Sequence, residues 1–198
     1  MFSLIALILA IDIHEFAHAW TADRLGDPTA RLAGRLTLNP LSHLDPIGTL
    51  ALFLVGFGWG RPVPFDPYNL RSPRRDSMII SLAGPTSNIL LALVCSLLLH
   101  LLLLVFTGPV IFFLAEFLRS LIIICITLAV FNLLPIYPLD GFKVVTGLLP
   151  THKAKEWDSL SSYGLFFLIV LLLPLPGGSI LTKIISPIIG FLLSLFLP

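Results

Sequence analysis

Hydrophobic residues fill long, nearly unbroken stretches of this chain, and polar residues gather between them. The hydrocarbon core of a bilayer, about 30 Å thick, takes about 20 helical residues to cross. Five apolar stretches bounded by charge, Pro or Gly reach or approach that length: residues 1–20, 77–106, 110–134, 160–173 and 180–197. The fourth is short, and Pro187 interrupts the fifth. The pattern predicts an all-α polytopic membrane protein with about five transmembrane helices.

Composition excludes an ordinary soluble domain, since 57% of the 198 residues are hydrophobic and only 12% are charged. A formal net charge of +1 gives no reason to expect nucleic acid as a partner. The first apolar stretch lacks a basic start and a small-residue cleavage site, so we interpret it as a retained helix. We expect one membrane-embedded domain, residues 1–198, with the lipid bilayer around it. The oligomeric state stays open.

The region between the first two spans is polar except for one apolar patch, residues 47–57, which is too short to cross comfortably. Arginines lie on both sides of this patch, so a crossing would violate the positive-inside rule. We expect the patch to dip into the membrane and return. The arginines before it are Arg24, Arg31 and Arg35, and those after it are Arg61, Arg71, Arg74 and Arg75.

Glycines and prolines follow the patch around Trp59 and Val63, within residues 56–64. This composition favours a re-entrant β-hairpin or a bulged ribbon, whose edge could accept an extended peptide. An amphipathic loop lying on the headgroups fits the composition equally well. With the basic region on the cytoplasmic side, five crossings leave the N-terminus outside and the C-terminus inside.

His14, Glu15 and His18 form an H-E-x-x-H pattern near the end of the first apolar stretch. Residues four apart share a helix face, so both imidazoles can bind one Zn²⁺ while Glu15 lies beside the metal as a base. Ionisable groups inside a membrane helix are costly unless they face a partner or a water-filled cavity. A metal site is therefore favoured over a pair of histidines that merely hydrogen-bond within the bundle.

A catalytic zinc needs a third protein ligand and an open position for water. Asp140 is the leading candidate, because two prolines break the third span just before it, at the depth where the first span presents His18. An Asp-Gly pair after Pro is otherwise typical of a turn. Asn88 and Asn132 lie where an amide could contact a peptide or an oxyanion, or simply join two helices. Asp12 has no assigned role.

These motifs together resemble those of the site-2 protease family of intramembrane zinc metalloproteases. The resemblance covers about residues 13–145, and four ordered motifs carry it. They are His14 to His18, residues 35–48 (RLTLNPLSHLDPIG), residues 84–88 (GPTSN) and residues 132–141 (NLLPIYPLDG). Asp12 departs from the family pattern, in which that position is mostly apolar or small. No PDZ or CBS domain is recognisable, so we expect a minimal form.

The resemblance implies a three-helix catalytic core over about residues 1–145, followed by C-terminal helices over about residues 160–197. It implies one zinc ion bound by His14, His18 and Asp140, with Glu15 as the base.

It further implies that residues 56–64, with Gly58, Trp59 and Val63, form a hairpin that receives substrate, and that Asn88 and Asn132 contact it. The implied substrates are transmembrane proteins or peptides, and the implied location is a prokaryotic plasma membrane with the active site toward the cytoplasm. A membrane metal carrier or silent metal-binding protein is the alternative, although such a protein has no need of Glu15.

Overall fold

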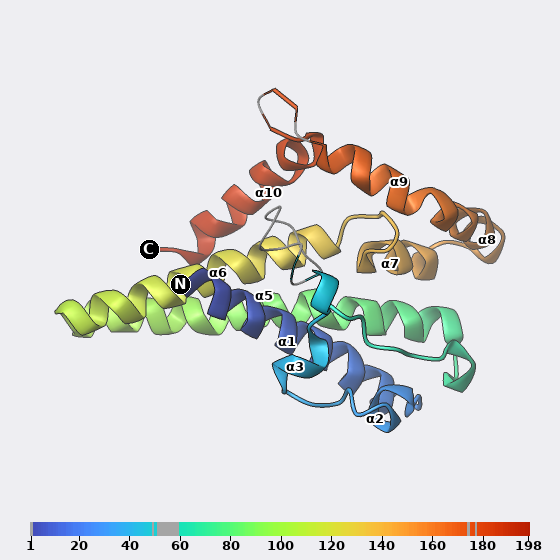
Figure 1. The fold of residues 1–198 in the computed structure, drawn as a ribbon, viewed down its shortest axis with the longest axis horizontal. Helices are drawn as coiled ribbons and strands as arrows, with labels where there is room; N and C mark the ends of the chain where they lie inside the picture. The colour runs from blue at the N-terminus through green and yellow to red at the C-terminus, as the bar shows by residue number, and fades with distance from the viewer. Residues whose placement is uncertain (1, 49, 51–59, 174, 177) are drawn as a thin grey trace.

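The computed structural model of the protein describes residues 2–48, 50, 60–173, 175–176 and 178–198. Within them lie three helices that are long and apolar enough to cross a membrane: α1 (Phe2–Arg24), α5 (Pro73–Val105) and α6 (Pro109–Asn132). They correspond to the first three predicted spans. α5 packs against both α1 and α6, and α1 also contacts α6, so the three form one bundle (Figure 1).

Small side chains line the helix crossings of this bundle. Ala10 of α1, Ala92 and Cys95 of α5, and Cys125 of α6 are buried in one cluster. Small residues let helix backbones approach closely where lipid supplies no hydrophobic drive for association. Both cysteines are free and buried, so they pack as small hydrophobic residues.

α5 begins at Pro73, four residues before the predicted start of the second span. Proline is well suited to the first turn of a helix, because its missing N–H has no intrahelical partner there. Asp76 in the same turn accepts a hydrogen bond from the Ser72 backbone N–H at 2.8 Å. The helix then continues through Pro85, which lies inside it.

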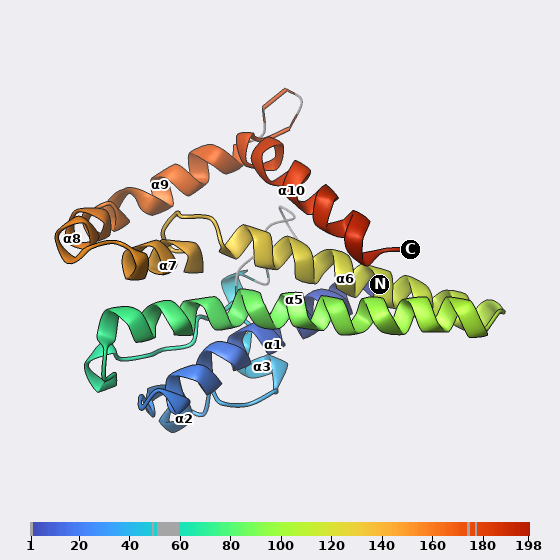
Figure 2. The ribbon, with the colours of Figure 1, turned by 180° about the vertical axis from the view of Figure 1, so that it is seen from behind.

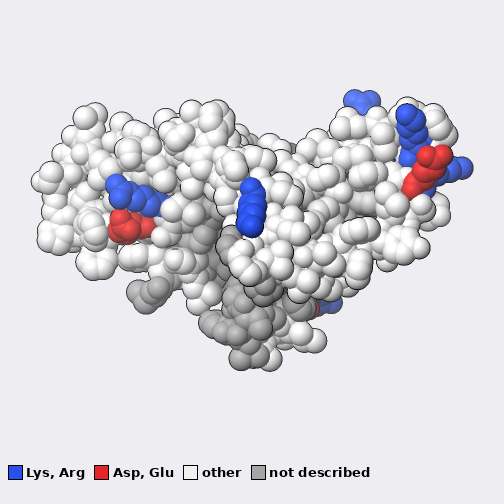
Figure 3. All heavy atoms as spheres, turned by 90° about the horizontal axis from the view of Figure 1, so that it is seen from above, with Lys and Arg blue, Asp and Glu red and all other residues white. Residues whose placement is uncertain are grey.

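The C-terminal part consists of shorter helices: α7 (Asp140–Leu148), α8 (Thr151–Ser159), α9 (Ser161–Leu172) and α10 (Ile180–Phe196). α9 leads away from α8, and α10 returns to pack on α6, as Figure 2 shows from behind. α9 and α10 are apolar but shorter than a typical span, so five crossings remain a prediction. α10 runs on through Pro187. On the face shown in Figure 3, charged side chains are few except at the end where α8 lies.

The polar region between α1 and α5 is organised by Asp27, which is fully buried. Its carboxylate accepts hydrogen bonds from the backbone N–H of Asp66 at 2.7 Å and from the Asn69 side chain at 2.8 Å. Burial raises the pKa of Asp27, but the donors of Thr29, Asn69 and Asp66 outweigh burial and hold the pKa below its ordinary value. The short helices α2 (Thr29–Leu32), α3 (Pro40–His43) and η1 (Pro67–Asn69) surround this connection.

The expected re-entrant hairpin falls largely outside the described residues. These exclude residues 51–59, and therefore Gly58, Trp59 and most of the apolar patch. The described part contains no β-strand, only an isolated antiparallel bridge between Leu44 and Gly60. The Arg61 N–H donates to the His43 carbonyl at 2.8 Å beside this bridge. The two ends of the segment are thus held together, while the hairpin remains a prediction.

Candidate metal centre

The histidine motif lies in the middle of the bundle, where α1 crosses α5. His14 and His18 are buried on one face of α1, with ring centroids 4.7 Å apart, and Glu15 is half-buried beside them. The periodicity of the helix accounts for the pairing, because residues i and i+4 lie one turn apart.

Asp140 reaches the same place from the break between α6 and α7. α6 ends at Asn132, and α7 begins at Asp140 itself after residues 133–139. Gly141 allows this geometry, since a Cβ there would collide with the Leu133 and Leu134 backbone. The sequence-based expectation that the two prolines break the third span is confirmed.

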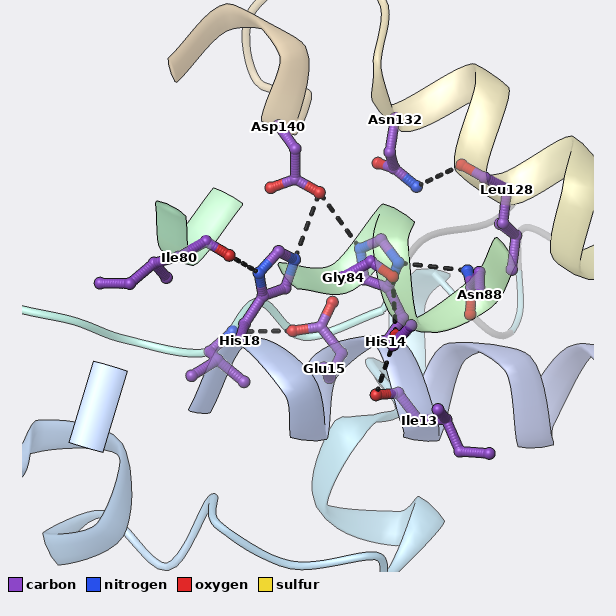
Figure 4. Close-up of polar contacts among 12 residues, drawn as sticks. Ile13, His14, Glu15, His18, Ile80, Gly84, Asn88, Leu128, Asn132 and Asp140 are labelled. Atoms are coloured by element: carbon purple, nitrogen blue, oxygen red, sulfur yellow. Dashed lines mark hydrogen bonds and ion pairs between the residues drawn. The ribbon is translucent and has the colours of Figure 1, made fainter. Parts of the chain in front are cut away.

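His14, His18 and Asp140 offer three ligand atoms that lie within 4.8 Å of one another (Figure 4). Asp140 Oδ2 is 3.1 Å from His14 Nε2 and 3.2 Å from His18 Nε2. Zinc–ligand bonds of about 2.0–2.2 Å in a tetrahedron set neighbouring ligand atoms about 3.3 Å apart. Two imidazoles and a carboxylate at this spacing fit one zinc ion, with one tetrahedral position left over.

The outer nitrogen of His18 has a partner that fixes its tautomer. His18 Nδ1 lies 2.7 Å from the Ile80 carbonyl oxygen of α5, which can only accept a hydrogen bond. Nδ1 therefore carries a proton, and Nε2 is the nitrogen that can offer a lone pair to a metal bound beside Asp140. A metal-binding histidine typically donates its other N–H in this manner.

Asn88 of α5 occupies the corresponding position beside His14. Its side-chain amide nitrogen lies 3.2 Å from His14 Nδ1, and its Oδ1 is buried without a hydrogen-bond partner. Amide oxygen and nitrogen are assigned from the hydrogen-bond network. Exchanging them gives Oδ1 a donor, the Nδ1–H of His14, and leaves His14 Nε2 free for the metal. Both histidines then present the same nitrogen to the centre.

Gly84 of α5 faces the two imidazoles directly. A Cβ built on Gly84 would lie against Nε2 of both His14 and His18, closer than real Cβ atoms come. The space that a metal and its water need is therefore kept open by a residue without a side chain. Gly84 belongs to the GPTSN motif, but the motif alone did not assign this role.

The carboxylate of Glu15 is oriented by the backbone of residues 62–64. The Val63 N–H donates to Glu15 Oε2 at 3.0 Å. Pro62 and Pro64 flank Val63 and have no N–H, so Val63 supplies the donor at this point of the segment. The other carboxylate oxygen is left to exchange a proton.

A pocket of about 140 Å³ adjoins these groups, and Glu15, Val63, Asn132, Asp140 and Lys143 are among its lining residues. Asn132 donates its amide to the Leu128 carbonyl at 3.0 Å, which leaves its Oδ1 for other contacts. Lys143 lies one turn along α7 from Asp140, and burial lowers its pKa, opposed by Asp140 and Glu15.

The surroundings of Asp140 favour the ionised form of its carboxylate. Burial raises its pKa, but the charges and hydrogen bonds of His18 and His14 outweigh burial and hold the pKa well below the ordinary value. The ionised form is the one that binds a metal.

Other polar residues of the sequence lie apart from this centre. Asp12 points to another face of α1, where its Oδ1 is 3.4 Å from His43 Nε2. Glu116 and Arg119 form a local ion pair at 3.4 Å. His100 contacts the Ser96 carbonyl at 2.8 Å. Sequence reasoning missed the burial of His43 and its contact with Asp12.

The fold and the site define a class of protein: helical proteins with helices long and apolar enough to cross a membrane, and with three potential metal ligands beside a carboxylate. Comparison with known proteins is more specific. The model of Peptidase family M50 matches residues 2–175. The chain is 36% identical over 200 residues to "Putative zinc metalloprotease YwhC" of Bacillus subtilis (strain 168), an alignment covering 98% of the chain and 90% of that protein.

It is also 34% identical over 172 residues to "Putative zinc metalloprotease Rip2" of Mycobacterium tuberculosis (strain ATCC 25618 / H37Rv), covering 84% of the chain and 64% of that protein. No solved structure matches the chain. The chain belongs to peptidase family M50, the family of the site-2 protease, as its motifs indicated.

Proposed function

We propose that the protein is an intramembrane zinc metalloprotease of the site-2 type, which hydrolyses peptide bonds within or near transmembrane segments. Membership of peptidase family M50 and the zinc metalloprotease names of its relatives support this activity. The observation that carries the proposal is that His14 and His18 of α1 meet Asp140 of α7 beside Glu15. His14 and Asp140 are 126 residues apart in sequence.

In this proposal, His14, His18 and Asp140 bind one zinc ion, which supplies Lewis acidity that activates water and polarises a peptide carbonyl. Glu15 is the base. Its Oε2 is held by the Val63 N–H, so Oε1 accepts a proton from the attacking water and later delivers it to the leaving amine. Ile80 and Asn88 hold the two imidazoles by their outer nitrogens during this cycle.

A transmembrane substrate hides its carbonyls in helical hydrogen bonds, so it must unwind locally before Glu15 can act on it. Asn132 lines the pocket and is proposed to contact the unwound backbone. Asn88 is proposed to act on substrate only indirectly, through His14. Gly58, Trp59 and Val63 are proposed to belong to the segment that receives the substrate.

We further propose that residues 1–198 form one membrane-embedded domain, with its catalytic core over about residues 1–145. The active site would open to the cytoplasmic side of a prokaryotic plasma membrane, because the arginine-rich connection and α8 lie at that end of the bundle. Both α9 and α10 would cross or partly cross the bilayer.

The test compares the zinc-loaded wild type with Glu15→Gln in vesicles that contain a model transmembrane substrate. Glu15→Gln keeps the shape of the residue and is expected to retain zinc while cleavage falls at least about 100-fold, the usual lower range for losing a positioned base. Glu116→Gln is the matched control, since Glu116 lies in α6 beside Arg119, away from the pocket.

Cleavage that survives Glu15→Gln would overturn the assignment of the base. A metal carrier would behave differently in the same vesicles, because it would move zinc across the bilayer and leave the substrate intact.

A further inference from the structure

A larger groove opens beside the zinc pocket and has no part in the proposed chemistry. Its volume is about 690 Å³, within the usual range for ligand sites. One wall is the extended segment that includes Val63 and Phe65, and the other walls come from the first turn of α5, from α7 and from α8.

The groove is continuous with the zinc pocket. Val63, Phe65 and Lys143 line both. The zinc pocket, at about 140 Å³, has room for only a few small groups, since one water molecule takes about 30 Å³ of liquid. A polypeptide whose scissile bond lies at Glu15 must therefore continue outside the pocket, and the groove adjoins it.

The groove lies at the polar end of the molecule. α8 supplies part of its wall and has the sequence THKAKEWDS, with few apolar residues. Figure 3 shows charged atoms gathered at the same end, where Figure 1 places α8. A segment bound in the groove would therefore lie outside the hydrocarbon of the bilayer.

Basic side chains outnumber acidic ones among the charged residues of the groove, whose remaining lining is largely apolar. Arg74, Lys143 and Lys155 line it, against one carboxylate, Asp158. Asp158 already accepts a hydrogen bond from the Thr146 hydroxyl at 2.8 Å, so the acid has a partner within the wall. Lys143 lies over the Phe65 ring, with its ammonium 4.3 Å from the ring centroid, at the junction with the zinc pocket.

We propose that this groove binds the juxtamembrane segment of the substrate and favours acidic side chains there. The proposal rests on the proposed protease function and adds a substrate class to it. Most membrane proteins carry Lys and Arg next to the membrane on the cytoplasmic side. A groove with excess basic side chains disfavours juxtamembrane segments rich in Lys and Arg. It favours transmembrane proteins that carry Asp or Glu beside the cleaved segment.

The test uses three transmembrane substrates that differ only in four residues next to the span, either Asp, Asn or Lys. The full chain is loaded with zinc in phosphatidylcholine vesicles. Wild type is expected to cleave the Asp substrate about three- to tenfold faster than the Lys substrate, because exposed ion pairs contribute modestly and several act together. High salt should reduce this ratio.

The variants are Lys155→Glu and a matched control, Lys153→Glu. Both lysines are exposed on α8, but only Lys155 lines the groove. Lys155→Glu is expected to lower or reverse the Asp-to-Lys ratio, and Lys153→Glu to leave it at the wild-type value. Equal effects of the two variants, or a ratio near one in the wild type, would overturn the proposal.

A binding measurement separates this proposal from the protease function. Glu15→Gln protein is mixed with substrates that carry a photo-crosslinker in the flank. Crosslinks to α7 or α8 that are stronger for the Asp flank support the groove even if no substrate is cleaved, whereas crosslinks elsewhere overturn it. Cleavage that ignores flank charge but follows the content of anionic lipid would make the groove a lipid site instead.

Discussion

Two faces of α1 each carry a contact between histidine and aspartate, which is partly buried on one face and buried on the other. On one face, His14 and His18 meet Asp140 with nitrogen–oxygen distances of 3.1 and 3.2 Å. On the other, Asp12 meets His43 at 3.4 Å. Residue types are the same on both sides, so composition does not separate a metal site from a structural pair.

The surroundings of the two contacts distinguish the metal site from the structural pair. The first face has three ligand atoms, a glycine in place of a side chain, and an adjoining pocket. The second has two groups, with His43 only 1% exposed and its Nε2 also 2.9 Å from the Thr37 carbonyl. The His43 carbonyl in turn accepts a hydrogen bond from the Arg61 N–H, so His43 also helps to hold Arg61 in place. The number of convergent ligands and the open space identify the metal face.

Replacing the aspartate on each face tests the difference between the two faces most strongly. Asp140→Ala is expected to lower zinc affinity by more than about 100-fold, beyond the range seen when only an outer partner of a ligand is lost. Asp12→Ala is expected to keep zinc and to leave the free energy of unfolding within about 1–3 kcal/mol of the wild type, because loss of the 3.4 Å contact with His43 is offset by removal of a buried carboxylate oxygen that has no hydrogen bond. Metal analysis and thermal unfolding in detergent measure both. Equal zinc loss in the two variants would contradict the distinction.

Gly84→Ala tests the open space on the metal face. The added methyl group would lie against both ligand nitrogens, and we expect zinc affinity to fall about 10- to 100-fold, as for other changes next to metal ligands. Gly190→Ala is the control, because nothing lies within 4 Å of a Cβ at that position in α10. Competition with a chelator measures affinity. Unchanged affinity in Gly84→Ala would show that the site has more room than the structure gives it.

Asn88 tests how the metal face orients its ligands. Asn88→Asp keeps an acceptor for the His14 Nδ1–H and is expected to retain zinc, whereas Asn88→Leu removes the acceptor and should weaken zinc binding about tenfold. Comparison of zinc affinities for the two variants gives the answer. If Asp and Leu weakened binding equally, the orienting hydrogen bond would be excluded.

Asp27 extends the comparison to a carboxylate that is buried but fully hydrogen-bonded. Its folded pKa lies below the ordinary value of about 3.9, so the unfolded chain binds the proton more readily. The stabilisation it gives is complete above that value and is lost as the pH falls through the folded pKa.

We therefore expect the unfolding temperature to drop on acidification below about pH 4, and Asp27→Asn to weaken this dependence. Thermal unfolding between pH 3 and 7 measures it. An Asp27→Asn variant with the full wild-type pH dependence would show that other carboxylates cause it.

Much of the metal face was predictable from sequence. The 3.6-residue period of the helix places His14 and His18 together. Because ionisable side chains are costly within a membrane, a cluster of them without a partner or a water-filled cavity is improbable. The prolines before Asp140 indicated the break that brings the third ligand. Three long apolar helices followed from the length of the hydrophobic stretches.

The remaining features depend on how segments distant in sequence align. The contact of Gly84 with the imidazoles requires the register of α5 on α1, and the Asp12–His43 contact requires the path of a polar connection. No local pattern encodes either. The Val63 N–H reaches Glu15 across 48 residues, so its role as a donor was equally hidden. The substrate-contacting roles of Asn132, Gly58 and Trp59 stay predictions.

X-ray diffraction from crystals of the zinc-loaded protein, measured on both sides of the zinc absorption edge, tests the central claim most directly. The account predicts one anomalous peak bounded by His14 Nε2, His18 Nε2 and an Asp140 carboxylate oxygen, with Gly84 facing it. A zinc peak beside Asp12 and His43, or one bound by the two histidines while Asp140 lies elsewhere, would contradict it.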